Sequence, residues 1–190
     1  MLEQRLSLTS SVPAPSLAQV DEARLRRIVE AQFDALWRFL RRLGIAEGDV
    51  DDAVQEVILV LARKLHVVEA ESERSFVFST AFRIASDMRK RAKRRREIEA
   101  TPLYEQAGLG PDPETSAEQR RLTVLFGQVL EQLSLELRAV FVLYELEEFT
   151  MAEISEALAI PPGTVASRLR RGRETFERLA ARVLAEGEQP

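Results

Sequence analysis

Arginine side chains crowd into two short segments of this 190-residue chain, and the chemistry they offer is the binding of phosphates and bases. The chain has 27 basic residues, and its lysines are Lys64, Lys90 and Lys93. A guanidinium group binds phosphate in a forked geometry and stacks on bases, which a lysine ammonium cannot do. Residues 83–96 hold eight basic residues and one acidic residue, and residues 164–182 hold six arginines and two glutamates. Such segments are typical of a protein that binds a polyanion.

The overall charge of the chain conceals this segregation. The net charge is -4 at pH 7, which by itself argues against a nucleic-acid partner. The two arginine-rich segments carry +7 and +4, so the remaining residues carry -15. Each segment alone could be a solvated helix face, but two of them on an acidic chain favour nucleic acid as the partner.

The rest of the composition excludes most catalytic chemistry. The chain has no cysteine and one histidine, His66, so thiolate metal sites, iron–sulfur clusters, cysteine nucleophiles and multi-histidine sites are excluded. It also lacks a glycine-rich phosphate loop. We therefore expect no enzymatic activity, no cofactor, no metal and no small-molecule substrate. Without an apolar run of about 20 residues or a secretory signal pattern, we expect a cytoplasmic protein with no membrane contact.

The elements that must position the arginines are helices, because apolar residues recur at helical spacing through most of the chain. The pattern predicts an all-α fold of two small helical bundles, the second with a helix–turn–helix. Residues 1–20 are predicted to be a disordered extension and residues 97–117 a flexible linker rich in proline, glycine and acids. The bundles then cover residues 21–96 and 118–184, with a tail at 185–190.

Polar residues at helix-capping spacing predict where several helices begin. The predicted caps and capping boxes are Asp49, Thr115 with Glu118, Ser134, and Thr150 with Glu153.

The segment at residues 150–179, TMAEISEALAIPPGTVASRLRRGRETFERL, is the most informative part of the chain. A short helix, a turn around Pro161 and Pro162, and a longer arginine-rich helix form a helix–turn–helix pattern, whose second helix can enter the major groove of DNA. The alternative is an ordinary helical hairpin with a solvated basic face. Candidate base and phosphate contacts are the polar residues near the start of the second helix: Thr164, Ser167, Arg168, Arg170 and Arg171.

This segment with its surroundings, LSLELRAVFVLYELEEFTMAEISEALAIPPGTVASRLRRGRE, resembles domain four of bacterial RNA polymerase sigma factors, in particular the extracytoplasmic function (ECF) group. Its most specific part is GTVASRLRRGRE. In the first half, DDAVQEVILVLARKL is similar to the family's polymerase-binding helix. FVFSTAFRIASDMRKRAKRR is similar to the segment that melts and reads the promoter −10 element. Ser155 and Ala159 stand where the family usually has alanine and glycine, and we expect the fold to accept both small residues.

The resemblance implies an alternative sigma factor that binds core RNA polymerase, directs it to specific promoters and assists melting. For the −35 element it adds Arg173, as a phosphate contact, to the candidates above. On the helix at residues 51–65, the implied polymerase contacts are Asp52, Gln55, Glu56 and Leu59. Surplus apolar surface rimmed by acids suits a protein interface, although a fully buried central helix would show the same pattern.

For the −10 element, opening DNA requires positive charge along the separated strand and surfaces on which bases can stack. The resemblance points to the basic helix and to the loop before it, about residues 68–75, as the place that accepts a flipped base. The implied contacts are Phe76, Phe78, Arg83, Arg89, Lys90 and Arg91. Aromatic residues at helical spacing are more often core, and this reading of Phe76 and Phe78 stays open.

The expected partners are therefore core RNA polymerase, promoter DNA and, as the family implies, an anti-sigma factor. One alternative is a stand-alone helix–turn–helix regulator, which predicts a dimer on a palindrome. Another is an interaction protein that holds polymerase without reading DNA.

Overall fold

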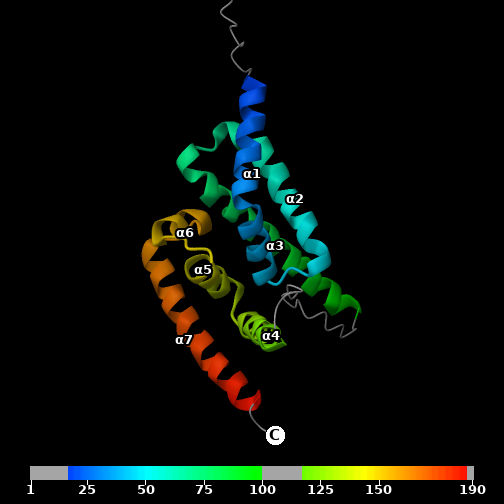
Figure 1. Cartoon of the computed structure of the whole chain (residues 1–190), viewed down its shortest axis with the longest axis vertical. Coiled ribbons are helices and arrows are strands. Elements are labelled where there is room, and N and C mark those ends of the chain that lie inside the picture. The colour runs from blue at the N-terminus through cyan, green and yellow to red at the C-terminus, as the bar shows by residue number, and fades with distance from the viewer. Residues whose placement is uncertain (1–16, 100–116, 188–190) are drawn as a thin grey trace, which may run out of the picture.

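The computed structural model describes residues 17–99 and 117–187, and within these ranges the fold is all-α, as predicted. Figure 1 shows α1 and α2 in the upper part of the view, α3 and α6 at its middle, and α4 with the end of α7 in the lower part. The helices are α1 (Leu17–Arg42), α2 (Glu47–Lys64), α3 (Glu73–Glu99), α4 (Ala117–Glu131), α5 (Leu135–Glu145), α6 (Met151–Leu158) and α7 (Pro162–Gly187). Two 3₁₀ turns, Leu65–Val67 and Ala70–Ser72, join α2 to α3.

The predicted helix starts are partly confirmed. Ser134 caps α5 by accepting a hydrogen bond from the backbone N–H of Leu137. Thr150 and Glu153 form the predicted capping box at the start of α6. The prediction that Asp49 caps the second helix is wrong, because α2 begins at Glu47 after an extended Ala46 that provides no side-chain cap. Asp49 lies in the first turn instead, where its negative charge stabilises the helix dipole.

The segment between the first group of helices, α1 to α3, and the second group, α4 to α7, is only partly described. Helix α3 continues to Glu99, into the predicted linker. The predicted capping box of Thr115 with Glu118 cannot be followed here, because Thr115 lies outside the described residues.

The two groups of helices share one continuous hydrophobic core. At their junction, the Phe78 ring of α3 lies between Phe39 of α1 and Phe149, which follows α5. The ring centroids are 5.2 Å and 4.7 Å from that of Phe78. The first and second halves therefore pack against each other through buried aromatic rings.

A buried arginine also lies at this junction. Arg138 of α5 is fully buried, and its Nη2 donates to the backbone carbonyls of Glu131 and Leu133 at the end of α4. Its Nε and Nη1 have no hydrogen-bond partner. Burial, together with the charge of nearby Arg89, lowers the pKa of Arg138 to about 10.

Candidate nucleic-acid interface

The helix–turn–helix is built from α6, a short turn and α7. Ile154 of α6 and Val165 and Leu169 of α7 are buried, so the two helices are fixed by an apolar contact. Ala159 ends α6 in the left-handed conformation, with φ of 51°. The Ser155 hydroxyl donates to the carbonyl oxygen of Ile160 at 2.6 Å and so closes the turn. Of the two residues that depart from the family pattern, Ser155 thus closes the turn, and Ala159 adopts a left-handed conformation that favours glycine.

The opposite face of α7 carries the predicted −35 contacts. Ser167, Arg170 and Arg171 are exposed, and Thr164 and Arg168 are half-buried on the same side. This placement follows from helical geometry, since Val165, Leu169 and Gly172 occupy the inner side. Arg170 is paired with Glu174 on the same helix at 2.6 Å. These predicted contacts therefore share one solvent-facing surface.

Arg173 lies on a different side of α7. Its guanidinium binds Glu145 of α5 at 2.5 Å and lies 5.3 Å from the centre of the Tyr144 ring. The hydrogen bond to Glu145 raises the pKa of Arg173 above its usual value. In this structure Arg173 is exposed and also joins α7 to α5 through this ion pair.

The basic residues predicted to contact the −10 element on α3 differ in their exposure to solvent. Arg83, Lys90 and Arg91 are exposed, whereas Arg89 is half-buried and donates from Nη1 to the carbonyl of Leu43 at 2.9 Å. Arg89 thereby ties α3 to the end of α1. The three exposed residues are the ones available to a phosphate backbone.

The two predicted aromatic contacts, Phe76 and Phe78, also differ in their exposure to solvent. Phe78 is 0% exposed and belongs to the core, so it cannot stack on a base in this arrangement. Phe76 is half-buried and lines a hollow of about 340 Å³ together with Arg83. Residues 67–69 and Ser72 on the α2–α3 connection also line this hollow, which coincides with the loop predicted to accept a flipped base. Glu156 of α6 contributes to the same hollow.

The predicted polymerase contacts lie along α2. Asp52, Gln55 and Glu56 are exposed, and Leu59 is 49% exposed. Their spacing of three and four residues places them in one stripe, while Val54, Val57 and Leu61 face the core. The alternative of a fully buried central helix is therefore wrong.

These surfaces can be compared with known proteins. The family model "Sigma-70, region 4" matches residues 123–176. This range includes α6, the turn after it, and α7 as far as Phe176. The sequence is 30% identical over 154 residues to the ECF RNA polymerase sigma factor SigL of Mycobacterium tuberculosis, covering 80% of this chain and 86% of that protein. This chain belongs to the ECF sigma factors.

A further ECF sigma factor, SigE of Mycolicibacterium smegmatis, is 28% identical over 164 residues. That alignment covers 85% of this chain but 63% of SigE, so this chain spans less than two thirds of SigE's length.

Two solved structures share the fold. The sigma factor RpoE from Bartonella quintana, in complex with the anti-sigma factor NepR, superposes with a TM-score of 0.69 at 20% identity. It covers 82% of this chain and 96% of RpoE. CnrH, in complex with the cytosolic domain of CnrY, superposes with a TM-score of 0.63 at 20% identity and covers 90% of this chain and 96% of CnrH.

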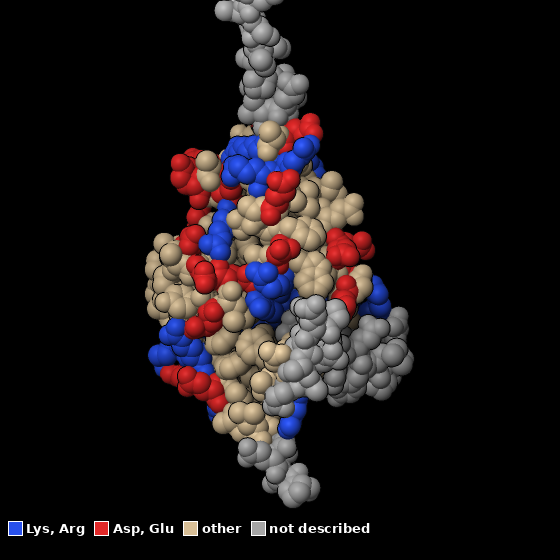
Figure 2. Space-filling view, viewed as in Figure 1, with Lys and Arg blue, Asp and Glu red and all other residues tan. Residues whose placement is uncertain are grey.

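On the visible face of this ECF sigma factor, charge is less segregated than along the sequence. In Figure 2, acidic and basic groups are interspersed over the visible face, and a basic cluster lies over α7. The acids beside the basic helices include Glu153 and Glu156 of α6. The hydrogen bond from the Thr150 backbone N–H lowers the pKa of Glu153, so this side chain stays ionised near neutral pH.

Sequence reasoning missed three residues at the junction of the two helix groups: Arg74, Glu147 and Phe149. Arg74 of α3 lies over the Phe149 ring at 3.9 Å and donates to the Glu147 carbonyl oxygen. The interacting residues are about 73 positions apart in the chain, and no local pattern marks them. Only the pair of adjacent acids, Glu147 and Glu148, could have drawn attention to this place.

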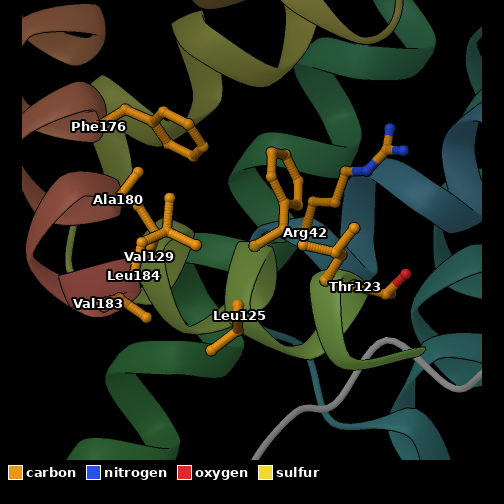
Figure 3. Close-up of a pocket in the computed structure, with 10 residues that line it drawn as sticks. Arg42, Thr123, Leu125, Val129, Phe176, Ala180, Val183 and Leu184 are labelled. Atoms are coloured by element: carbon orange, nitrogen blue, oxygen red, sulfur yellow. The ribbon is translucent and has the colours of Figure 1, made fainter. Parts of the chain in front are cut away.

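An apolar groove of about 480 Å³ lies between α4 and α7, and Figure 3 shows Leu125 and Val129 facing Phe176 and Ala180 across it. Arg42 of α1 reaches its rim. Within the described ranges, no helix is long and apolar enough to cross a membrane. The same part of the chain contains no cluster of acidic and histidine side chains able to hold a metal.

Proposed function

We propose that this protein is an alternative sigma factor that binds core RNA polymerase, directs it to specific promoters and assists their melting, without enzymatic activity of its own. The observation that carries the proposal is the helix–turn–helix within the matched Sigma-70 region, whose second helix presents arginines to solvent. The cytoplasm, where polymerase and promoters are found, is the proposed location.

We assign different contacts to the two helix groups. Residues 21–96 would hold the polymerase and −10 contacts, and residues 118–184 the −35 contacts. The α2 stripe of Asp52, Gln55, Glu56 and Leu59 combines carboxylates with an exposed apolar side chain, a composition suited to a protein partner. Because RpoE and CnrH were solved with NepR and CnrY, we also propose an anti-sigma partner for this protein.

The hollow around Phe76 and Arg83 is the proposed place for an unpaired −10 base. It offers an aromatic ring for stacking and a guanidinium for phosphate. Arg83, Lys90 and Arg91 would hold the neighbouring backbone, whereas Arg89 would act by keeping α3 in place.

Run-off transcription with purified core polymerase on a fragmented genomic library tests this function. We expect transcripts from a defined set of promoters only when this protein is added. No transcripts above those of core polymerase would contradict the proposal. A dimer that binds a palindrome tightly without polymerase would instead favour a stand-alone regulator.

Two variants distinguish recognition of a base by Arg171 from a general effect of positive charge on DNA binding. Arg171→Ala should weaken the binding of the holoenzyme to the −35 element by about 1–3 kcal/mol. It should also relax the preference for the base that Arg171 contacts. Arg178→Ala removes the same charge from the same face of α7, two turns further along. It should leave base preference unchanged, and equal relaxation in both variants would argue against base reading by Arg171.

A further inference from the structure

Arg24 of α1 joins the first helix to the connection between α2 and α3. Its Nη2 donates a hydrogen bond to the carbonyl oxygen of Val68 at 2.6 Å, and its Nη1 donates to that of Leu65 at 3.2 Å. Its Nε donates to the carboxylate of Glu73, the first residue of α3, at 2.7 Å. One guanidinium therefore binds three points of the connection, which lie 41 to 49 positions away along the chain.

These three contacts depend on the shape of the guanidinium. Its N–H groups point in fixed directions within one plane, whereas a lysine ammonium is a compact point charge on a flexible stem. The Arg24 side chain is 24% exposed and that of Glu73 is 9% exposed, so little water competes for these hydrogen bonds. The Leu65 carbonyl also lies just beyond the end of α2, where a positive charge is favourable. Arg24 therefore stabilises the connection through its geometry as well as through its charge.

The connection that Arg24 binds forms part of the hollow proposed to receive a −10 base. Residues 67–69 and Ser72 line this hollow of about 340 Å³ together with Phe76 and Arg83 of α3. Arg24 holds these lining residues at two places, since it binds the centre of residues 67–69 and the carboxylate of the residue after Ser72. The position of one wall of the hollow therefore depends on Arg24.

The backbone hydrogen bonds of the connection do not by themselves fix its position on α1. The Val68 N–H donates to the carbonyl oxygen of Leu65, and the Ser72 N–H donates to that of Glu69. Both hydrogen bonds span three residues, so they shape the two 3₁₀ turns without joining them to another helix. The buried Val68 side chain provides an apolar anchor, and Arg24 adds polar contacts of defined direction.

Arg27 provides an internal comparison. It lies three residues after Arg24 on the same helix, and its Nη2 donates to both carboxylate oxygens of Glu73, at 2.9 Å and 2.8 Å. Its side chain is 61% exposed. Among the described residues its hydrogen bonds go to Glu73, and none reaches a carbonyl of the connection. The two arginines therefore share one partner but differ in their contacts with the connection.

We propose that Arg24 is a positioning residue for the recognition of an unpaired −10 base, because it holds residues 65–73 against α1 and so presets the hollow that receives the base. This inference rests on the −10 role proposed above for α3 and the loop before it. Arg24 acts through the connection and does not itself touch DNA. A preset hollow avoids the loss of conformational entropy that ordering a loose loop during binding would cost. Base selection on α3 therefore depends on a residue of the first helix.

Arg24→Lys tests the proposal, with Arg27→Lys as the matched control. Both variants keep their positive charge and lose a guanidinium bound to Glu73, but only Arg24→Lys releases the carbonyls of Leu65 and Val68. Amide hydrogen exchange of the full-length protein measures how firmly the connection is held, without promoter or polymerase. We expect faster exchange across residues 65–72 in Arg24→Lys than in the parent or in Arg27→Lys. Unchanged exchange in Arg24→Lys would overturn the proposal.

The second measurement is DNA binding by holoenzyme assembled with each variant, on a promoter identified by run-off transcription. One probe exposes the −10 element as a single strand, and the other is a fully paired fragment that contains the −35 element. If the hollow of Arg24→Lys is preset for about one tenth of the time, this variant should bind the first probe about tenfold more weakly than the parent. Its binding to the second probe should be unchanged, and Arg27→Lys should match the parent on both probes.

Probes with an abasic site at each −10 position in turn distinguish positioning from general damage. Where the missing base is the one that enters the hollow, the difference in affinity between the parent and Arg24→Lys should disappear. A difference that persists on every abasic probe, or equal weakening on the single-stranded and paired probes, would overturn the positioning role. Either result would indicate a general loss of structure or of polymerase binding.

Glu73→Gln guards against misfolding of Arg24→Lys. It keeps an acceptor for Arg24 but removes the charge that orients the guanidinium, so it should show the same two changes at smaller amplitude. Their absence in folded Arg24→Lys and Glu73→Gln would overturn the proposal. Failure of the parent to open any promoter would contradict the sigma function and with it the −10 role of the loop. Normal promoter opening by the parent, with equal single-strand binding by Arg24→Lys, would overturn the role of Arg24 alone.

Discussion

The ring of Phe78 meets the ring of Phe149 at an interplanar angle of 64°, with centroids 4.7 Å apart. Phe78 belongs to the helix predicted to melt promoters, and Phe149 immediately precedes the helix–turn–helix. An edge-to-face pair of this kind adds to the stabilisation from buried apolar area. The packing of the two helix groups in this structure therefore includes a contact between these two rings.

Removal of the Phe149 ring should destabilise the protein strongly. Phe149 is buried, and Phe149→Ala should lower the free energy of unfolding in urea by about 3–5 kcal/mol through lost burial and a cavity. Phe33→Ala, at a residue 42% exposed on α1, is the control and should cost much less. Similar losses in both variants would show that the Phe149 contact contributes little.

Glycine at position 159 should stabilise the protein. Ala159 has φ of 51°, a conformation that costs a residue with a Cβ about 1–2 kcal/mol and costs glycine almost nothing. Ala159→Gly should therefore raise the free energy of unfolding by about 1 kcal/mol. The same exchange at exposed Ala166, inside α7, should lower it by about 1 kcal/mol. A loss at both positions would contradict the left-handed turn.

Gly44 should not tolerate a side chain. Its φ is 87°, and a Cβ there would lie 3.0 Å from Nη1 of buried Arg138 and would also meet Arg89. Gly44→Ala should lower the melting temperature, with a cost of about 2 kcal/mol or more. Gly48→Ala is the control, because no atom outside its own helix lies within 4 Å of the added methyl group. A stabilised Gly44→Ala protein would refute this reading of the α1–α2 turn.

The ion pairs of Glu73 should make stability sensitive to acid. Burial acts to raise the pKa of Glu73, but hydrogen bonds from Arg24 and Arg27 outweigh it and lower the pKa below its usual value. The stabilisation is therefore complete above the unfolded pKa of about 4.3 and is lost as pH falls through the lower folded pKa.

Chemical denaturation between pH 7 and pH 3 measures this effect. Glu73→Gln should be less stable than the parent at pH 7, and the difference should shrink as acid protonates Glu73 in the parent. If the difference in free energy of unfolding between the two proteins stays constant from pH 7 to pH 3, ionisation of Glu73 contributes nothing to stability.

Local sequence was sufficient for the helices and for much of the candidate site. The all-α fold, the Ser134 cap and the Thr150–Glu153 capping box depend on residues within a few positions of one another, so periodicity and capping chemistry predicted them. The exposed faces of α2 and α7 were also predictable, because they too depend on helical periodicity. The Asp49 cap failed because the N-cap of α2 is Ala46, three residues earlier, a shift that propensity does not resolve.

The sequence by itself predicted an all-α fold with two basic helices and a resemblance to the ECF sigma factors. Only the tertiary structure decided which basic and aromatic residues remain available to DNA. Phe78 and Arg89 satisfy the same residue patterns as their exposed neighbours, but contacts with distant segments bury Phe78 and tie Arg89 to Leu43. Arg173 stays exposed but is paired with Glu145 of α5. The contacts of Glu147 with Arg38, Arg42 and Arg74 were equally hidden, because these arginines lie 73 to 109 positions away along the chain. Packing between distant segments, which no local pattern encodes, thus selects the functional surface.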